Sequence, residues 1–365
     1  MSVPVLVSVV IPAFNAEETI DEAIESVCSQ THTNFECLVI DDGSTDGTRE
    51  RIRRWQEKDP HRIRLLAHPN GENRGTAVSR NLGLDHATGE YVAFLDADDA
   101  WLERKLEVQL ATFNDAGPQV GMVFSGTVVC RATAPDKLRD VPGTDGEDVQ
   151  CLAQLFSGVT GSSLESLLFR PATEFINWVP SPTPLIRRSY LPKAIRFIGP
   201  PVLRTQFEDY LMWLILSTQC EFIFVPERLA YYRIHPHQFT SSYQDRSSAV
   251  DYLADTLNLL DVLQNRAGNC LSSRGAFLRL LEKRSKLILT VTRHVPMPLA
   301  RRINTIPITH VPRLLRLAIS ERILLKTICE VAYRYLRYTL LRCRTNRLYG
   351  WFASPGTSAT RDATQ

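Results

Sequence analysis

The chain of 365 residues exceeds the length of a typical single domain, so one large domain with an appendage, or two domains, is expected. Its hydrophobic content of 44% and charged content of 22% are ordinary for a soluble globular protein. The net charge of +2 conceals an asymmetry, because residues 293–347 contain twelve Lys or Arg and only two acids, which leaves the remainder at −8. This split predicts a basic tail that meets an anionic partner.

The cysteine pattern and the hydropathy of the chain indicate in which cellular compartment the protein is expected. The eight cysteines are scattered, with no Cys-x-x-Cys pair, which favours free thiols in a reducing compartment over a disulfide framework. The apolar N-terminus lacks a basic region and a cleavage site, so we expect a first strand there and no signal peptide. No apolar run reaches the ~20 residues that a bilayer span requires. We expect a cytoplasmic protein, or one that is peripheral on the cytoplasmic face of the membrane.

The first 100 residues alternate apolar, β-branched runs with segments of helical periodicity. The predicted strands cover residues 6–12, 35–40, 63–67 and 91–95. The predicted helices cover residues 20–28, 49–58 and 76–86. Such alternation predicts right-handed βαβ units and a mostly parallel sheet, whose ligand lies beyond the carboxyl ends of its strands.

Polar clusters follow three of these strands, at residues 13–17, at Asp41 and Asp42, and at residues 96–99. Asp96 and Asp98 point the same way if the chain stays extended, and they repel each other unless a cation lies between them. A hard divalent cation, Mg²⁺ or Mn²⁺, that also holds phosphate oxygens is the candidate. A strand that ends in a solvated acidic turn is the alternative. Neither a Gly-x-Gly-x-x-Gly turn nor a Gly-x-x-x-x-Gly-Lys loop occurs, which favours a nucleotide held through acidic residues and a metal.

The pattern is weaker after residue 117. We expect a strand within residues 119–129, a loop or insertion at 131–148 and a turn that leads into a strand at 181–188. An apolar helix opens at 207–210, and strands at 222–225 and 229–234 close the sheet. Beyond residue 247 the chain is expected to be almost wholly helical, with breaks at four prolines.

Five segments resemble, in order and spacing, the family 2 glycosyltransferases, an inverting group with the GT-A fold. They are SVVIPAFNAEETI (8–20), QTHTNFECLVIDDGSTDGT (30–48), NRGTAVSRNLGLDHATGEYVAFLDADD (73–99), FEDYLMW (207–213) and YYRIHPHQFTS (231–241). The resemblance implies an α/β fold of GT-A type, with a mostly parallel nucleotide-binding sheet flanked by helices. It implies a catalytic domain at 1–245, divided into a nucleotide-sugar-binding half (1–115) and an acceptor-binding half (116–245). A helical, basic C-terminal region would follow at 246–365.

The resemblance also assigns roles to individual residues. Glu17 and Asp41 would reach the base and ribose, Asp98 would be the direct metal ligand, and His235 would approach the metal or diphosphate. The nucleotide-sugar-binding residues would be Pro12, Ala13, Asn15, Glu17, Asp41, Arg74, Arg80 and Asp96. An ion pair within the fold remains the alternative for each of the two arginines.

Asp209 matches the base of the family, which takes a proton from the acceptor hydroxyl as that oxygen attacks the anomeric carbon. The implied enzyme is a metal-dependent hexosyltransferase. It would move one sugar from a nucleotide-diphosphate sugar to a glycan or lipid-linked acceptor of the cell envelope. The Gln-x-x-Arg-Trp motif of processive synthases is absent, which favours single transfer. A nucleotidyltransferase of similar topology and a catalytically silent sugar-nucleotide-binding protein are the alternatives.

The basic tail has helical periodicity. Leu324, Ile328, Val331, Tyr335 and Tyr338 fall opposite an arc of Arg and Lys residues between 322 and 347. Such a helix suits an anionic membrane surface, and packing on the catalytic domain is the alternative. Nucleic acid is a poorer partner, because no recognised binding module accompanies the charge.

Overall fold

The computed structural model describes residues 5–131, 138, 179–193, 195–199, 208–217 and 219–235. Spatial contacts divide the chain into two units, Met1–Leu287 and Ile288–Gln365, and the described residues all belong to the first. The predicted helical region at 246–365 and the predicted insertion, apart from residues 131 and 138, lie outside them. Within the described ranges, no helix is both long and apolar enough to cross a membrane.

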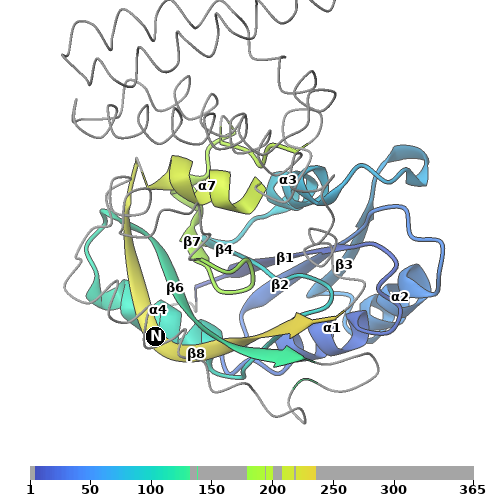
Figure 1. Cartoon of the computed structure of the whole chain (residues 1–365), viewed down its shortest axis with the longest axis horizontal. Helices are drawn as coiled ribbons and strands as arrows, with labels where there is room; N and C mark the ends of the chain where they lie inside the picture. Colours follow the sequence, from blue (N-terminus) through green and yellow to red (C-terminus); the bar gives the residue numbers. More distant parts are fainter. Residues whose placement is uncertain are drawn as a thin grey trace, which may run out of the picture. The chain divides into compact units, whose positions relative to one another are not determined.

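One eight-stranded sheet, in the order β3-β2-β1-β4-β7-β6-β8-β5, forms the centre of the fold (Figure 1). The strands are β1 (Val7–Ala13), β2 (Phe35–Asp41), β3 (Ile63–Ala67), β4 (Tyr91–Phe94), β5 (Ala100–Trp101), β6 (Val120–Arg131), β7 (Leu185–Arg187) and β8 (Glu221–Ile234). Strands β3, β2, β1 and β4 pair in parallel, as predicted. The other half is mixed, since β7 is antiparallel to β4 and β6, β5 is antiparallel to β8, and β6 and β8 are parallel.

The last described strand differs from the prediction. The sequence predicts two strands on either side of Pro226, but β8 runs unbroken through this residue. Proline has no N–H for the ladder and is tolerated at a bulge. The pairing with β6 shifts register beside Pro226: Ser125 faces Val225, whereas Gly126 faces Arg228. This irregularity accommodates Pro226 and keeps β8 continuous.

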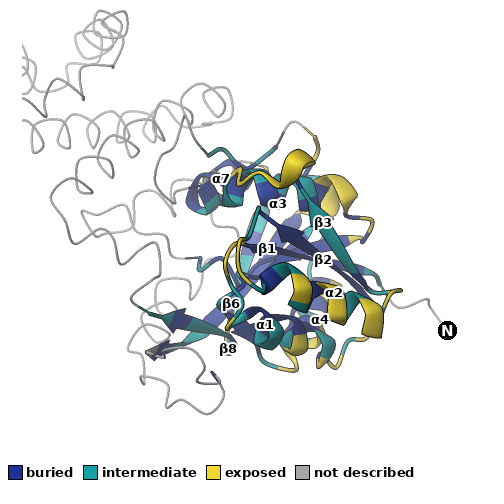
Figure 2. Ribbon diagram, turned by 90° about the vertical axis from the view of Figure 1, so that its right-hand side faces the viewer, coloured by how far each residue is buried: buried dark blue, intermediate teal, exposed yellow. Residues whose placement is uncertain are grey.

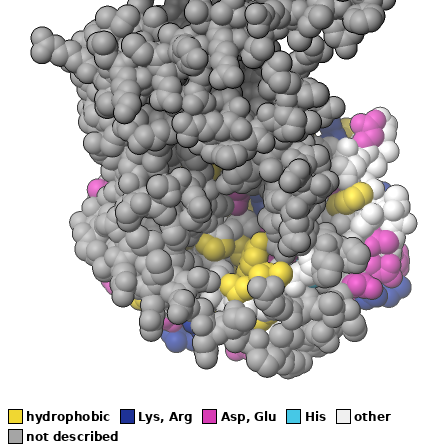
Figure 3. All heavy atoms as spheres, in the orientation of Figure 1, with side chains coloured by type: hydrophobic (Ala, Val, Ile, Leu, Met, Phe, Trp, Pro, Cys, Tyr) yellow, Lys and Arg dark blue, Asp and Glu magenta, His cyan; other side chains and the backbone are white. Residues whose placement is uncertain are grey.

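Helices cover both faces of the sheet. They are α1 (Ile20–Cys28), α2 (Thr48–Lys58), α3 (Thr76–His86), α4 (Lys105–Asp115) and α7 (Glu208–Leu216). Side chains of β1 alternate between two cores: Val9 and Ile11 pack with residues of α1, α2 and α4, and Val10 packs with residues of α3 and α7. Strands β1, β2 and β4 are therefore buried throughout, and exposure concentrates on the outer helices (Figure 2). Helix α2 buries only Thr48 and Ile52, and charged side chains gather at its edge of the molecule (Figure 3).

Candidate active site

Buried Asp42 joins the loops after β1 and β2 to the loop before α3, through its backbone N–H and its carboxylate. The backbone N–H of Asp42 donates to the carbonyl oxygen of Ala13 at 2.8 Å. Its Oδ1 accepts the N–H of Arg74 at 2.7 Å, and its Oδ2 accepts the N–H of Gly75 at 2.9 Å. The loop before α3 is thus fixed against the strand ends. The side chain of Arg74 is exposed on this loop, which is where a nucleotide-binding residue is expected.

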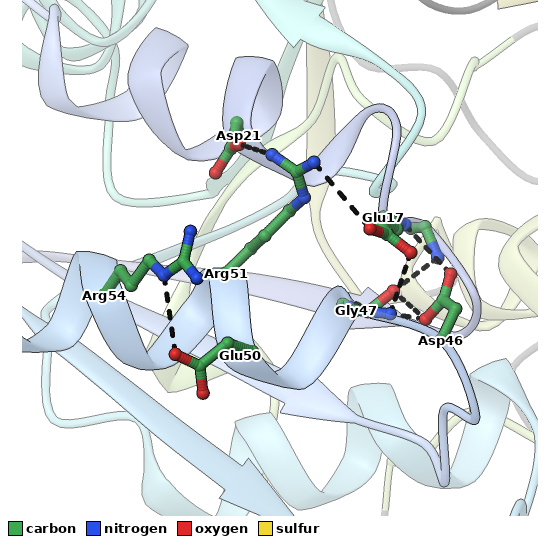
Figure 4. Close-up of polar contacts among 9 residues, drawn as sticks. Glu17, Asp21, Asp46, Gly47, Glu50, Arg51 and Arg54 are labelled. Carbon is green, nitrogen blue, oxygen red and sulfur yellow. Dashed lines mark hydrogen bonds and ion pairs between the residues drawn. The ribbon is translucent and has the colours of Figure 1, made fainter.

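The loop after β1 is tied to the start of α2. Asn15, at φ +47°, accepts the N–H of Thr45 on its Oδ1 at 2.8 Å. Glu17 accepts the N–H of Gly47 on its Oε2 at 2.9 Å, and its Oε1 lies 3.8 Å from Arg51 (Figure 4). A carboxylate is favourable at a helix N-terminus. Glu17 therefore stabilises the beginning of α2 in addition to any contact with a ligand.

Further predicted residues of the nucleotide-sugar-binding half lie at the ends of β1 and β2, where the loops begin. Pro12 and Ala13 end β1, where Ala13 pairs with Asp41 of β2. Asp41 is buried, and its Oδ1 accepts the N–H of Ser44 at 3.0 Å. Phe14, the next residue after β1, is 49% exposed and is the large hydrophobic side chain that the described surface presents most openly. The sequence analysis gave Phe14 no role, although its place between Ala13 and Asn15 marks it.

Arg80 of α3 joins the two halves of the site. Its side chain is 3% exposed; Nη2 donates to Asp96 Oδ1 at 2.6 Å, and Nη1 donates to Glu208 Oε1 at 3.1 Å. Ser181 donates a further hydrogen bond to Asp96. Burial lowers the pKa of Arg80, but attraction by Asp96 and Glu208 outweighs burial and raises it. Of the two predicted roles for Arg80, the ion pair is the one that its geometry displays.

The ion pairs of Arg80 with Asp96 and Glu208 bring the start of α7 close to the acidic residues that follow β4. Asp209 lies in the first turn of α7, next to Glu208, and its Oδ1 accepts the N–H of Tyr210 at 2.6 Å. Burial and the negative charge of Glu208 raise the pKa of Asp209 to about 7, against the opposing effect of Arg80. A general base works best when its pKa lies near the working pH. Asp209 thus has the proton affinity that a base needs near neutrality.

The two predicted metal ligands lie together. His235 Nε2 is 3.0 Å from Asp98 Oδ2, although 137 positions separate them in the chain. In this structure the contact is a hydrogen bond, and its length is also the spacing of two ligands at right angles around an ion at about 2.1 Å each. No group of three or more His, Cys, Asp or Glu side chains that could hold a metal occurs among the described residues. A Mg²⁺-like ion commonly uses one or two carboxylates and completes its shell with phosphate oxygens and water.

Comparison with known proteins shows the fold and the family to which part of this chain is similar. Residues 8–139 match the family model described as Glycosyl transferase family 2. This part of the chain is similar to glycosyl transferase family 2. WfgD of Escherichia coli, a UDP-Glc:alpha-D-GlcNAc-diphosphoundecaprenol beta-1,3-glucosyltransferase, is 38% identical over 138 residues, or 36% of this chain and 53% of WfgD. The putative teichuronic acid biosynthesis glycosyltransferase TuaG of Bacillus subtilis is 46% identical over 105 residues, or 29% of this chain and 40% of TuaG. The chain thus spans about half the length of these curated relatives.

Two solved structures share the fold. The crystal structure of S. aureus TarS residues 1–349 in complex with UDP matches at a TM-score of 0.53 and 19% identity, covering 80% of this chain and 76% of that one. The mannosyltransferase PcManGT of Pyrobaculum calidifontis, in complex with GDP-Man and Mn²⁺, matches at 0.50 and 19%, covering 82% and 78%. The predicted GT-A type α/β fold is confirmed.

Several site residues were missed by the sequence analysis. Asp42 and Glu208 were seen beside Asp41 and Asp209, but each was given no role of its own. Ser181 was predicted only as part of a turn, and its bond to Asp96 spans 85 positions. A repeated signal was available for Asp42 and Glu208, since each is one of two adjacent acids at the end or start of an element.

Proposed function

We propose that this protein is a metal-dependent, inverting glycosyltransferase that moves a single sugar from a nucleotide-diphosphate sugar to an acceptor hydroxyl. The supporting observation is the Arg80 bridge, which joins strand-end Asp96 to Glu208 and so brings Asp209 to the nucleotide side of the sheet. The acceptor is a glycan or lipid-linked glycan of the cell envelope. The names of WfgD and TuaG, which concern such molecules, support this class.

The chemistry follows from the positions of the acids. Asp209 takes the proton of the acceptor hydroxyl while that oxygen forms a bond to the anomeric carbon. The bond from the anomeric carbon to the diphosphate oxygen breaks, and the nucleoside diphosphate leaves with the electron pair. Attack opposite the leaving group inverts the anomeric configuration. Asp98 and His235 would hold a divalent cation, Mn²⁺ or Mg²⁺, which offsets the charge that builds on the departing diphosphate.

The nucleotide-sugar-binding half would bind the donor through residues in and around the loops after β1, after β2 and before α3. Arg74 is exposed near the strand ends and supplies a positive charge for the phosphates. Asp41, Glu17 and Asn15 fix the loops around the base and ribose. Arg80, which is paired with two carboxylates, would orient Asp96 and Glu208 and would neutralise part of their charge.

A donor panel tests this proposal directly. UDP-, GDP- and TDP-sugars are incubated with the protein, with Mn²⁺ or with EDTA, and release of nucleoside diphosphate is measured. We expect one donor class to be consumed, with Mn²⁺ and not with EDTA. A silent sugar-nucleotide-binding protein would bind a donor and release nothing, and a nucleotidyltransferase would release pyrophosphate from a nucleoside triphosphate.

A further inference from the structure

Arg233 of β8 contacts the acidic loop after β4 from below. Its side chain is 2% exposed. Its Nε donates to the backbone carbonyl oxygen of Asp98 at 2.9 Å, and its backbone N–H donates to Asp99 Oδ1, also at 2.9 Å. The loop and the strand therefore hold each other reciprocally, each through one main-chain and one side-chain group.

The guanidinium of Arg233 is itself held by Glu22 of α1. Nη2 donates to Glu22 Oε2 at 2.6 Å, and the other oxygen of Glu22 accepts the N–H of Leu138 at 2.8 Å. Both carboxylate oxygens thus have partners. Planar Arg–carboxylate contacts of this kind restrict orientation more strongly than a lysine would. The side chain of Arg233 is fixed from α1 while it reaches the loop.

This arrangement adjoins the candidate metal ligands, because Arg233 bonds to the main chain of Asp98 and lies two residues before His235. Asp98 follows β4, and His235 lies one residue past the end of β8 at Ile234. The side chains of Asp98 and His235 are 34% and 19% exposed, whereas that of Arg233 is buried. The pairing of β6 with β8 extends to Ile234 opposite Arg131, and His235 directly follows the end of β8.

We propose that Arg233, oriented by Glu22, is a positioning residue that sets the distance between Asp98 and His235 and thereby the affinity of this site for a divalent cation. The inference rests on the proposed function, which assigns a cation to these two side chains. Partners behind first ligands commonly change metal affinity by about 10–100-fold. Arg233 acts through the main chain of Asp98 and through the strand that carries His235, and it touches no substrate.

The test measures Mn²⁺ binding by the electron paramagnetic resonance signal of free Mn²⁺, with the full chain, alone and with UDP or GDP. Arg233→Lys keeps the charge but replaces the two guanidinium nitrogens that contact Asp98 and Glu22 with a single ammonium. Glu22→Gln keeps the shape of the side chain that contacts Arg233. It provides the test if Arg233→Lys fails to fold. Glu25→Gln, an exposed acid on the same helix, is the matched control. We expect each of the first two variants to raise the Mn²⁺ dissociation constant about 10-fold or more, with the control unchanged.

A double-mutant cycle separates positioning from general stability. Because Arg233 sets the distance between Asp98 and His235, Arg233→Lys combined with His235→Ala should weaken Mn²⁺ binding by clearly less than the sum of the two single changes. Full additivity, or wild-type Mn²⁺ affinity in both Arg233→Lys and Glu22→Gln, overturns the positioning role. Absence of Mn²⁺ binding in the wild type, or binding unchanged by Asp98→Ala, overturns the metal site of the proposed function itself.

Discussion

Asp209 and Glu208 are adjacent carboxylates with different surroundings. Glu208 is paired with Arg80 at 3.1 Å, whereas Asp209 lies beside that pair in the first turn of α7. Burial raises the pKa of both groups. The ion pair keeps Glu208 engaged within the fold, which leaves Asp209 as the acid suited to exchange a proton with an acceptor.

Replacing Asp209 with Asn removes the base and keeps the shape. We expect turnover to fall by at least about 10²-fold, the usual scale for loss of a general base. Donor affinity should stay close to that of the wild type, because Arg80 and Asp96 remain paired. Isothermal titration with the donor and initial-rate measurements separate the two quantities. Collapse of donor affinity would make Asp209 a nucleotide contact or a structural residue.

The pH profile of a Glu208→Gln variant tests how Asp209 is tuned. The base must be deprotonated, so activity falls as the pH drops through its pKa of about 7. Glu208 contributes to raising that pKa, and its removal also leaves the charge of Arg80 less compensated. Both changes favour the carboxylate form of Asp209. We expect the acid limb of kcat/KM to move to lower pH, and an unmoved or higher limb would contradict the assignment.

At the scale of elements, the loops beyond β1, β2 and β3 form one packed unit. Gly43 lies at φ +77°, and a Cβ there would meet the backbone nitrogen of Asn73 and the carbonyl oxygen of Gly71 at 2.7 Å. The close approach lets Asp42 reach the N–H groups of Arg74 and Gly75. Glycine is needed at position 43 for its backbone angle and for its lack of a side chain.

Gly71 offers a matched control for this contact. It lies at φ +64°, but a Cβ there meets nothing within 4 Å. Gly71→Ala should therefore cost only the left-handed backbone penalty, about 1–2 kcal/mol. Gly43→Ala should destabilise more, because backbone atoms would have to move. Chemical denaturation of both variants measures the difference, and equal losses would contradict the packed-loop interpretation.

Local patterns predicted the regular elements well and the tertiary contacts poorly. Helix α3 spans Thr76–His86, the range that its periodicity predicts, and the parallel strands follow from their β-branched runs. Strand β5 has two residues, too few for a period, and α4 was given no prediction. Pro226 suggested a break between two strands, but the register shift against β6 accommodates this proline within one strand.

In the candidate site too, some features could be predicted from local patterns and the tertiary contacts could not. Strand-end acids could be predicted to converge, because parallel strands end at one edge. The partner of a buried charge could not be predicted, because the folded chain brings together residues that are far apart in the sequence. Arg80 contacts Glu208 across 128 positions, and Arg233 contacts Glu22 across 211. The resemblance supplied Asp98 with His235, and the structure brings them to 3.0 Å.

At the scale of the whole molecule, the basic tail remains a prediction from sequence. Its residues lie outside the described ranges, and every candidate catalytic residue precedes position 240. We expect removal of residues 320–365 to release the protein from anionic vesicles while donor hydrolysis persists. Binding should weaken with salt, because the screening length is about 8 Å at physiological ionic strength. Co-sedimentation at low and high salt measures this, and equal sedimentation of both forms would favour packing on the catalytic domain.

The most direct test of the proposed mechanism is the anomeric configuration of the first product. An α-linked donor from the panel is turned over with water or a simple glycoside acceptor, and proton NMR follows the anomeric signal from the earliest time points. A single displacement with Asp209 as base predicts a β-configured product that appears before any equilibration. An α-configured first product would contradict that mechanism and the role of Asp209 within it.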